Sequence, residues 1–320
     1  MRFVRVFLLL GIIFIQSIAD SIIDTSSTLE SPNQTPQIPI VNGFKKLYSL
    51  HADNFIFLES LSPTHSNDAN QTQDNTILKN PTISNKPKIL LIMDDIQNAS
   101  QIKQIQSLPL KIIPSIFPKT KYNPKTPLIA QKNAFYMIHL PLEAQNFEQK
   151  ELEPIKVGTS KDNIYAIIAQ IKQDFPNLLY INNHTGSKFT QSEKDMLNLL
   201  SVFDELGLKF IDSVTTPHPA SEKISHQQKR LIMQRDIFLD NEISTTHTKA
   251  QLKLAIQKAQ KKGYIIAICH PHTSTFKALK QMSDELNHAL EFVTPKELES
   301  YLSSQAITHY TRERFYANAQ

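Results

Sequence analysis

The 320-residue sequence has no tryptophan, a single cysteine and only 6 glycines. One cysteine excludes an internal disulfide framework and any zinc site built from several cysteines. Glycine makes up about 2% of the chain, against an average of about 7%, and neither glycine-rich phosphate-binding pattern, GxGxxG or GxxxxGK[ST], occurs. The formal net charge of +4 is too small to favour nucleic-acid binding. What remains is a chain long enough to bury a sizeable core.

The first 19 residues have the pattern of a targeting segment. Arg2 and Arg5 precede an apolar run over 6–15, and Ser17-Ile18-Ala19 approximates a small-x-small cleavage site. The run is shorter than the roughly 20 residues that a membrane span needs. Residues 1–19 therefore predict an exported, periplasmic protein with a cleaved signal peptide. The alternative is a retained anchor that holds the protein to the inner membrane.

Residues 20–87 are rich in Ser, Thr, Asn, Gln, Asp and Pro, and so poor in apolar side chains over 62–76 that ordering this part is unfavourable. We interpret 20–87 as a low-complexity tether. Residues 41–61 are the exception, since they contain enough apolar side chains for a small docking element that could contact an envelope protein partner.

From residue 88 onward, strand patterns alternate with helical patterns. The expected strands are 88–93, 111–117, 135–140, 178–182, 208–212, 232–239, 264–269 and 289–293. The expected helices are 99–107, 160–175, 190–206, 248–262, 273–286 and 294–302. Strands that alternate with helices imply parallel βαβ units, and seven or eight units favour a distorted (β/α) barrel over 88–302, followed by a C-terminal tail at 303–320.

Local signals fix several helix ends. Thr190 and Glu193 match a capping box that would open the helix to Leu206. Gly207 and Gly263 occupy the positions where a glycine ends a helix. The run Thr294-Pro295-Lys296-Glu297 places a cap, a proline and a glutamate in their favoured positions.

Polar and ionisable side chains gather at the carboxyl ends of the expected strands. They are Asp94, Asp95, His139, Asn182, Asn183, His184, Asp212, Asp240, Asn241, His270 and His272. A single strand-end aspartate often only caps the next helix, and a single histidine is often an ordinary core or surface residue. Because parallel strand ends converge on one face, the set together predicts an active site. Carboxylates with imidazoles suit zinc, with an open position for water.

Six segments carry a resemblance to a known family. They are LLIMDD (90–95), IHLPLE (138–143), NNHTGSKFT (182–190), IDSVTT (211–216), RDIFLDN (235–241) and AICHPH (267–272). In this order and across 88–302, the sequence resembles the divergent polysaccharide deacetylases. These are distant relatives of the metal-dependent polysaccharide deacetylases, carbohydrate esterases that remove acetyl groups from glycans such as peptidoglycan on a distorted (β/α) barrel.

The resemblance implies a role for each matching position. Asp94 matches the catalytic base, Asp95 a metal ligand, and His270 the general acid in a Leu-x-His element that reads Ile-Cys-His here. His139 matches the first of two ligand histidines, but Glu143 occupies the second position.

Either Glu143 is a ligand or His184 replaces the missing histidine. The further substrate-binding or supporting residues are Glu143, Asn182, Asn183, Ser187, Asp212, Asp240 and His272.

One element of the related enzymes is absent. Their arginine-proline-tyrosine motif, whose arginine orients the base, is replaced here by NNHTGS. Two hypotheses remain open. The first is an exported metal-dependent hydrolase, with zinc as the expected cofactor, that deacetylates a cell-envelope glycan such as peptidoglycan. The second is a non-catalytic envelope protein that keeps the barrel and binds glycan or a protein partner.

Overall fold

The computed structural model describes residues 85–147 and 152–317, with side chains up to residue 306. The expected signal segment, almost all of the tether and the docking element at 41–61 lie outside these residues. Within the described ranges, no helix is both long and apolar enough to cross a membrane.

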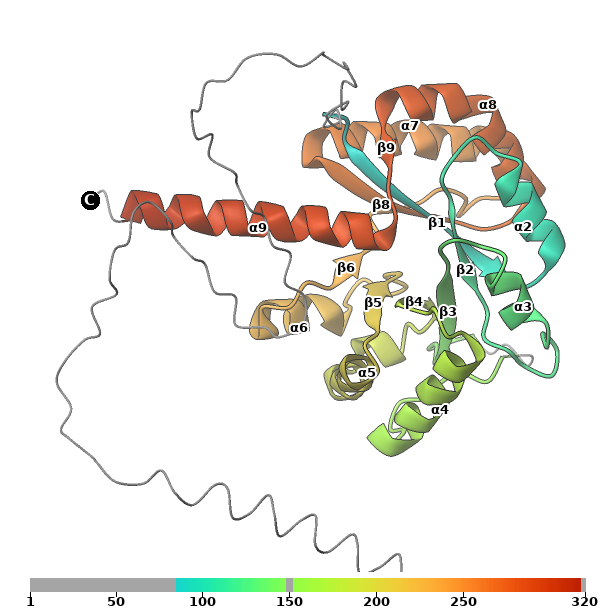
Figure 1. Ribbon diagram of the computed structural model, residues 1–320, viewed down its shortest axis with the longest axis vertical. Coiled ribbons are helices and arrows are strands. Elements are labelled where there is room, and N and C mark those ends of the chain that lie inside the picture. The colour runs from blue at the N-terminus through green and yellow to red at the C-terminus, as the bar shows by residue number, and fades with distance from the viewer. Residues whose placement is uncertain (1–84, 148–151, 318–320) are drawn as a thin grey trace, which may run out of the picture. The chain divides into compact units, whose positions relative to one another are not determined.

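Nine parallel strands form one sheet. The strands are β1 (Lys88–Ile96), β2 (Ile113–Ile116), β3 (Met137–Leu142), β4 (Tyr180–Thr185), β5 (Lys209–Asp212), β6 (Met233–Gln234), β7 (Ile237–Phe238), β8 (Tyr264–Cys269) and β9 (Glu291–Phe292). Eight of them follow the order β6-β5-β4-β3-β2-β1-β8-β7, and β9 pairs with the first residues of β1. The sheet is curled (Figure 1). The two strands at the ends of its path, β6 and β7, are consecutive in sequence.

Two residues carry the chain from one edge of the curled sheet to the other. The backbone N–H of Arg235 donates to Asp212 at the end of β5, whereas that of Asp236 donates to Ile266 in β8. Residues 232–239 were expected to form one strand, and this expectation is wrong. The segment changes partner at Arg235-Asp236 and forms two short strands, of which β6 pairs with β5 and β7 pairs with β8.

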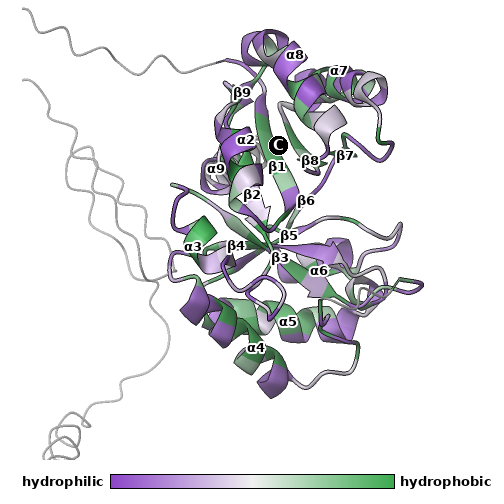
Figure 2. Cartoon of the chain, turned by 90° about the vertical axis from the view of Figure 1, so that its right-hand side faces the viewer, coloured by the Kyte–Doolittle hydropathy of each residue, from purple (hydrophilic) through white to green (hydrophobic). Residues whose placement is uncertain are grey.

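Helices cover the outer face of the sheet. They are α2 (Ala99–Gln106), α3 (Thr126–Ala130), α4 (Lys161–Asp174), the 3-10 turn η1 (Phe189–Gln191), α5 (Glu193–Glu205), α6 (Ala220–Gln228), α7 (Thr245–Lys262), α8 (Thr273–Ala289) and α9 (Pro295–Ala317). Their hydrophilic residues face outward, and the apolar strands lie at the centre (Figure 2). The sequence therefore predicted the barrel class correctly.

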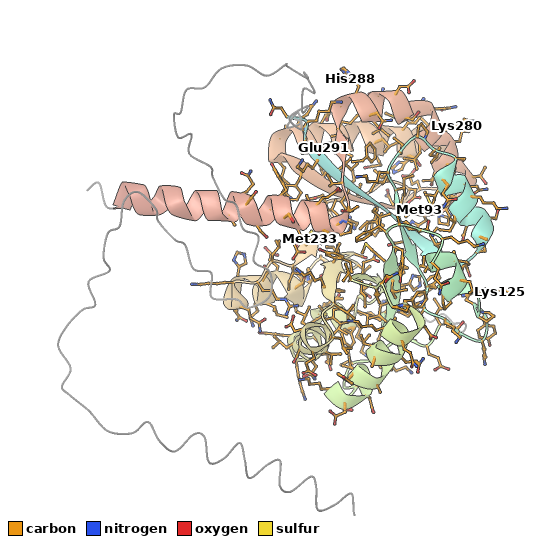
Figure 3. The ribbon with its side chains drawn as sticks, viewed as in Figure 1. Met93, Lys125, Met233, Lys280, His288 and Glu291 are labelled. Atoms are coloured by element: carbon orange, nitrogen blue, oxygen red, sulfur yellow. The ribbon has the colours of Figure 1, made fainter. Side chains whose placement is uncertain are left out.

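Alternate residues of each strand point to different cores. On β1, Ile89, Leu91 and Met93 pack outward against the helices, and Met93 lies near the middle of the molecule (Figure 3). Leu90 and Ile92 point into the barrel, where they join inward residues of the other strands. All five side chains have no exposed surface, so the middle of β1 is buried on both faces.

The start of α9 covers the amino-terminal end of the barrel. Leu298 joins the inner apolar cluster together with Met233, which lies beside the first turns of α9 (Figure 3). Glu299 accepts hydrogen bonds from Tyr180 and Lys209, at the starts of β4 and β5. The opposite, carboxyl-terminal end of the barrel is thus the end left for a site.

The start of α5 and the end of α9 differ from the expected positions, whereas the start of α9 agrees with them. The capping box at Thr190 is wrong, because Ser192 caps α5 by accepting from the backbone N–H of Asp195, and Thr190 donates to the carbonyl of Gly186 instead. The helix expected over 294–302 continues to Ala317. Its capping residues are as expected, since Thr294 and Glu297 bond reciprocally.

Candidate functional site

The inward positions of the strands change from apolar to polar near the carboxyl-terminal end of the barrel. On β1 the series Leu90, Ile92 ends in Asp94, and on β8 the series Ile266, Ile268 leads to His270 just beyond the strand. The other strands behave in the same way, and the polar residues that they place at this end are Ser115, His139, Asn182, His184 and Ser213. Because every second residue of a strand points into the barrel, the inward side chains form an apolar core that ends in a polar layer at the carboxyl-terminal end of the barrel.

Asp94 and Asp95 are consecutive, and in a regular strand they would face opposite sides of the sheet. The pairing of β1 with β2 shifts register between Met93 and Ile96, and Asp95 has φ of 58°. A bulge of this kind re-aims side chains at a strand end. It allows both carboxylates to approach His139.

Three ligand atoms converge above the barrel. Asp95 Oδ1 lies 3.3 Å from His139 Nε2 and 3.1 Å from His184 Nδ1, and the two nitrogens are 3.1 Å apart. Ligands of a tetrahedral zinc ion, each about 2.0–2.1 Å from the metal, lie about 3.3 Å from one another. The triangle thus has the size of one face of a zinc coordination sphere.

Asp95 Oδ1 supplies an independent test of this fit. It is buried, and no described donor reaches it in hydrogen-bond alignment despite the short distances to both imidazoles. Burial acts to raise the pKa of Asp95, but His139 and His184 outweigh burial and hold the pKa well below its usual range. A buried, ionised and unaligned oxygen between two imidazoles suits a divalent cation. Asp95, His139 and His184 are the residues that would hold it.

The structure distinguishes the two residues that the sequence offered as the third ligand. Glu143 turns away from the cluster, since its carboxylate accepts from Lys188 Nζ at 2.8 Å and from the backbone N–H of Val157 at 2.8 Å. The Lys188 hydrogen bond lowers the pKa of Glu143. His184, and not Glu143, lies with Asp95 and His139.

Asp94 lies under this triangle and is almost fully buried. Asn182 Nδ2 donates to both of its oxygens, at 2.9 and 3.1 Å. Burial raises the pKa of Asp94, and the neighbouring His139 and His270 oppose that shift. A carboxylate with this placement can accept a proton from a water molecule in the pocket above it.

His270 follows β8, the strand paired with β1, and so comes next to Asp94, since Met93 and Cys269 are partners in the two strands. Its Nδ1–H donates to Asp240 Oδ1 at 3.0 Å, and Asp240 Oδ2 accepts from the His270 backbone N–H and from Thr275 Oγ1 at 2.7 Å each. Burial lowers the pKa of His270, but Asp240 and the more distant Asp94 outweigh it and raise the pKa to about 9. His270 is therefore protonated at neutral pH and can donate a proton through Nε2.

A pocket of about 300 Å³ joins these groups. Asp94, His139, His184 and His270 all line it, and the aromatic side chains of Phe147 and Phe238 contribute to its walls. The ring of Phe238 stacks on that of His270, with the two ring centroids 5.9 Å apart. The guanidinium carbon of Arg235 lies 3.7 Å from the centroid of the Phe238 ring. The acid group is thus held by Asp240 at its edge and by Phe238 at its face.

The remaining predicted residues divide into two groups. Asn183 and Ser187, which the sequence offered as substrate-binding or supporting residues, line the pocket. Asp212 does not reach it, because this buried carboxylate accepts from Ser221 Oγ and from the backbone N–H of Val214, below the pocket lining. Asp212 is therefore not a pocket-lining residue, and burial raises its pKa.

His272 forms a second group with Asp240 and His270 in which the possible ligand atoms lie within 4.8 Å. Hydrogen bonds already occupy both Asp240 oxygens. The protonated state of His270 further disfavours a metal there, since a metal ligand must be a neutral imidazole.

Sequence reasoning missed three residues that support the site. Ser115 and Ser213 bond to Asn182, and Thr275 bonds to Asp240. Ser115 and Ser213 both follow the inward alternation of their strands, which was the available signal. Thr275 lies in the first turn of α8, where the sequence offers no comparable pattern.

The part of the chain that contains these strand ends is similar to known proteins. Residues 91–298 match the family of divergent polysaccharide deacetylases. The uncharacterized protein YibQ of Escherichia coli K12 is 27% identical over 207 residues, which are 64% of this chain and 64% of YibQ. An uncharacterized protein of Haemophilus influenzae is 27% identical over 195 residues, 60% of this chain and 70% of that protein. This chain thus matches less than two thirds of the length of YibQ.

A solved structure supports the fold. The crystal structure of the uncharacterized protein ATU2773 from Agrobacterium tumefaciens C58 has a TM-score of 0.59 and 15% sequence identity, and the match covers 68% of this chain and 92% of that chain. The family match spans every strand end that contributes to the triangle, the base position and the acid position. The chain therefore belongs to the divergent polysaccharide deacetylase family.

Proposed function

We propose that the protein is a metal-dependent hydrolase that removes acetyl groups from a cell-envelope glycan. One observation carries the proposal. His139 and His184, two members of the ligand triangle, line the same pocket as a buried carboxylate, Asp94, and a protonated imidazole, His270, and the third member, Asp95, lies within 3.3 Å of both histidines. A protein that only bound glycan would need neither Asp94 nor His270 at its position.

Each side chain has a task in amide or ester hydrolysis. A divalent ion held by the triangle would lower the pKa of a bound water and polarise the acetyl carbonyl. Asp94 accepts a proton from the attacking water. His270 delivers a proton to the leaving nitrogen or oxygen when its bond to the acetyl carbon breaks, so that water and the acetylated sugar yield acetate and the free amine or hydroxyl. Asp240 keeps His270 in the orientation and protonation state for this step.

The family supports an acetylated polysaccharide as substrate. Phe147 and Phe238 offer apolar faces, and Ser187 and Thr215 offer hydroxyl groups around the pocket. The targeting pattern in residues 1–19 supports export to the periplasm, where peptidoglycan would be available. Zinc is the metal that we expect from one carboxylate and two imidazoles with an open position.

Acetate release from isolated peptidoglycan and from acetylated chito-oligosaccharides tests the proposal. The protein is stripped with a chelator and reloaded with one equivalent of zinc. We expect release by the reloaded protein, and a loss of about 10²-fold or more in Asp94→Asn and His270→Gln. His288→Gln is the matched control, because His288 lies at the far end of α8, away from the pocket (Figure 3).

Two results would count against an enzyme. One is a zinc-loaded protein that releases no acetate from N- or O-acetylated substrates. The other is release that Asp94→Asn and His270→Gln leave unchanged. In the first case, glycan binding without turnover would favour the non-catalytic reading of the family.

A further inference from the structure

Asn182 is the only described residue whose side chain donates hydrogen bonds to the carboxylate of Asp94. His139 Nε2 is 3.6 Å from Asp94 Oδ2, too far for a hydrogen bond. Arg235 is nearby, but its Nε and Nη2 donate to the carbonyls of Ser213 and Val214. The orientation of the Asp94 carboxylate therefore depends on one neutral amide.

The amide of Asn182 is itself held in place. Its Oδ1 accepts from Ser115 Oγ at 2.5 Å, and its Nδ2 lies 3.1 Å from Ser213 Oγ. An ionised Asp94 carboxylate can only accept, so the Nδ2 end of the amide must face it, and the Ser115 hydroxyl then donates to the Oδ1 end. All four side chains are buried. The chain of contacts joins β2, β4, β1 and the residue that follows β5, so backbone from four parts of the barrel determines the amide position.

We propose that Asn182 is the positioning residue for Asp94 and that it orients the carboxylate toward the reacting water. The idea rests on the proposed function, in which Asp94 accepts a proton. Both Asp94 oxygens accept from the same Nδ2, which fixes the plane of the carboxylate about its last rotatable bond. Without the amide, that bond is free to turn, and catalysis is sensitive to displacements of about 1 Å.

Two substitutions separate positioning from a general packing role. Asn182→Leu keeps about the same shape but has no donor, and Asn182→Ser keeps a polar group that is too short to reach Asp94. Ser221→Ala is the matched control, because it removes a buried side-chain hydrogen bond to an aspartate, Asp212, outside the pocket. Each zinc-loaded full chain is assayed for acetate release, analysed for zinc content and crystallised.

We expect kcat to fall about 10²-fold in both Asn182 variants, with KM within about threefold of wild type. Crystal structures should show the Asp94 carboxylate rotated, while Asp95, His139 and His184 keep their positions and one equivalent of zinc. Ser221→Ala should keep the wild-type kcat and Asp94 orientation. If Asn182→Leu does not fold, Asn182→Ser supplies the same comparison.

An Asp94 carboxylate that keeps its orientation in the Asn182 variants would overturn the proposal, as would an unchanged kcat. Loss of zinc together with the rotation would also overturn it, since the residue would then support the whole site. If the wild type releases no acetate, the proposed function fails, but the crystal structures still decide whether Asn182 orients Asp94.

Discussion

Asp94 and Asp95 are neighbours in sequence, and both carboxylates lie within 3.6 Å of the same atom, His139 Nε2. A regular β-strand cannot place consecutive side chains on one side of the sheet. The register shift in β1 and the left-handed backbone of Asp95, with φ of 58°, make this arrangement possible. One bulge therefore gives the site a buried carboxylate for the proposed proton transfer and a second carboxylate for the proposed metal.

The ligand assignment predicts the effect of three substitutions on zinc affinity. Asp95→Asn, His139→Ala and His184→Ala should each weaken zinc binding by about 100-fold or more, since each removes one of three protein ligands. Asparagine is the substitution of choice at Asp95 because it tolerates positive φ. Isothermal titration of the stripped protein with zinc gives the affinities.

Glu143→Gln is the control for the ligand variants. Its carboxylate bonds to Lys188 and Val157 and not to the triangle, so zinc affinity should stay within about threefold of wild type. A large loss in Glu143→Gln, with His184→Ala unaffected, would instead assign Glu143 as the third ligand.

The pKa of His270 predicts a pH dependence of stability. Its folded-state pKa of about 9 lies above the ordinary histidine pKa of 6.5, so the folded protein binds this proton more tightly than the unfolded chain. The stabilisation that the protonated His270 gives to the fold is fully present below about pH 6.5, and it is lost as the pH rises through about 9. Over this window the unfolding free energy should fall with a slope of up to about 1.4 kcal/mol per pH unit.

Urea unfolding of chelator-treated wild type and His270→Gln at pH 6, 7.5 and 9 measures this contribution. The groups that face His270 are Asp240 after β7, Asp94 and Asp95 on β1, and His272 at the start of α8. The difference between the two proteins should shrink as the pH rises. If the unfolding free energies of the two proteins changed equally with pH, His270 would not be held protonated by Asp240.

Gly186 predicts a steric effect at the turn after His184. It has φ of 95°, and a Cβ there would lie 2.9 Å from Leu142 Cβ, whereas Gly158 has φ of 84° and open space. Both alanine variants bear the cost of positive φ, about 1 kcal/mol. Gly186→Ala should lose about 1–3 kcal/mol more, because overpacking adds to that cost. Urea unfolding compares the two variants, and equal losses would show that the turn adjusts without strain.

The sequence predicted much of this architecture because buried parallel strands have a strong pattern. β8 coincides with the expected strand at 264–269, and the polar residues at strand ends do meet at one end of the barrel. Local patterns could not predict where a chain changes partners, and so 232–239 was taken as one strand. The change at Arg235-Asp236 depends on β5 and β8, which are distant in sequence.

The third member of the proposed ligand triangle and the partners of Asp94 were equally hard to predict. Glu143 and His184 were both candidates, and only the direction of their side chains distinguishes them. The chain from Ser115 through Asn182 to Asp94 spans 67 and then 88 residues of sequence. Such contacts follow from the curl of the sheet, which no local signal specifies.

Anomalous diffraction at the zinc absorption edge, from crystals of the zinc-loaded protein, tests the metal-centred account most directly. We predict a single strong peak bound by Asp95 Oδ1, His139 Nε2 and His184 Nδ1. A peak bound instead by Asp240, His270 and His272, or no peak after loading, would contradict the account.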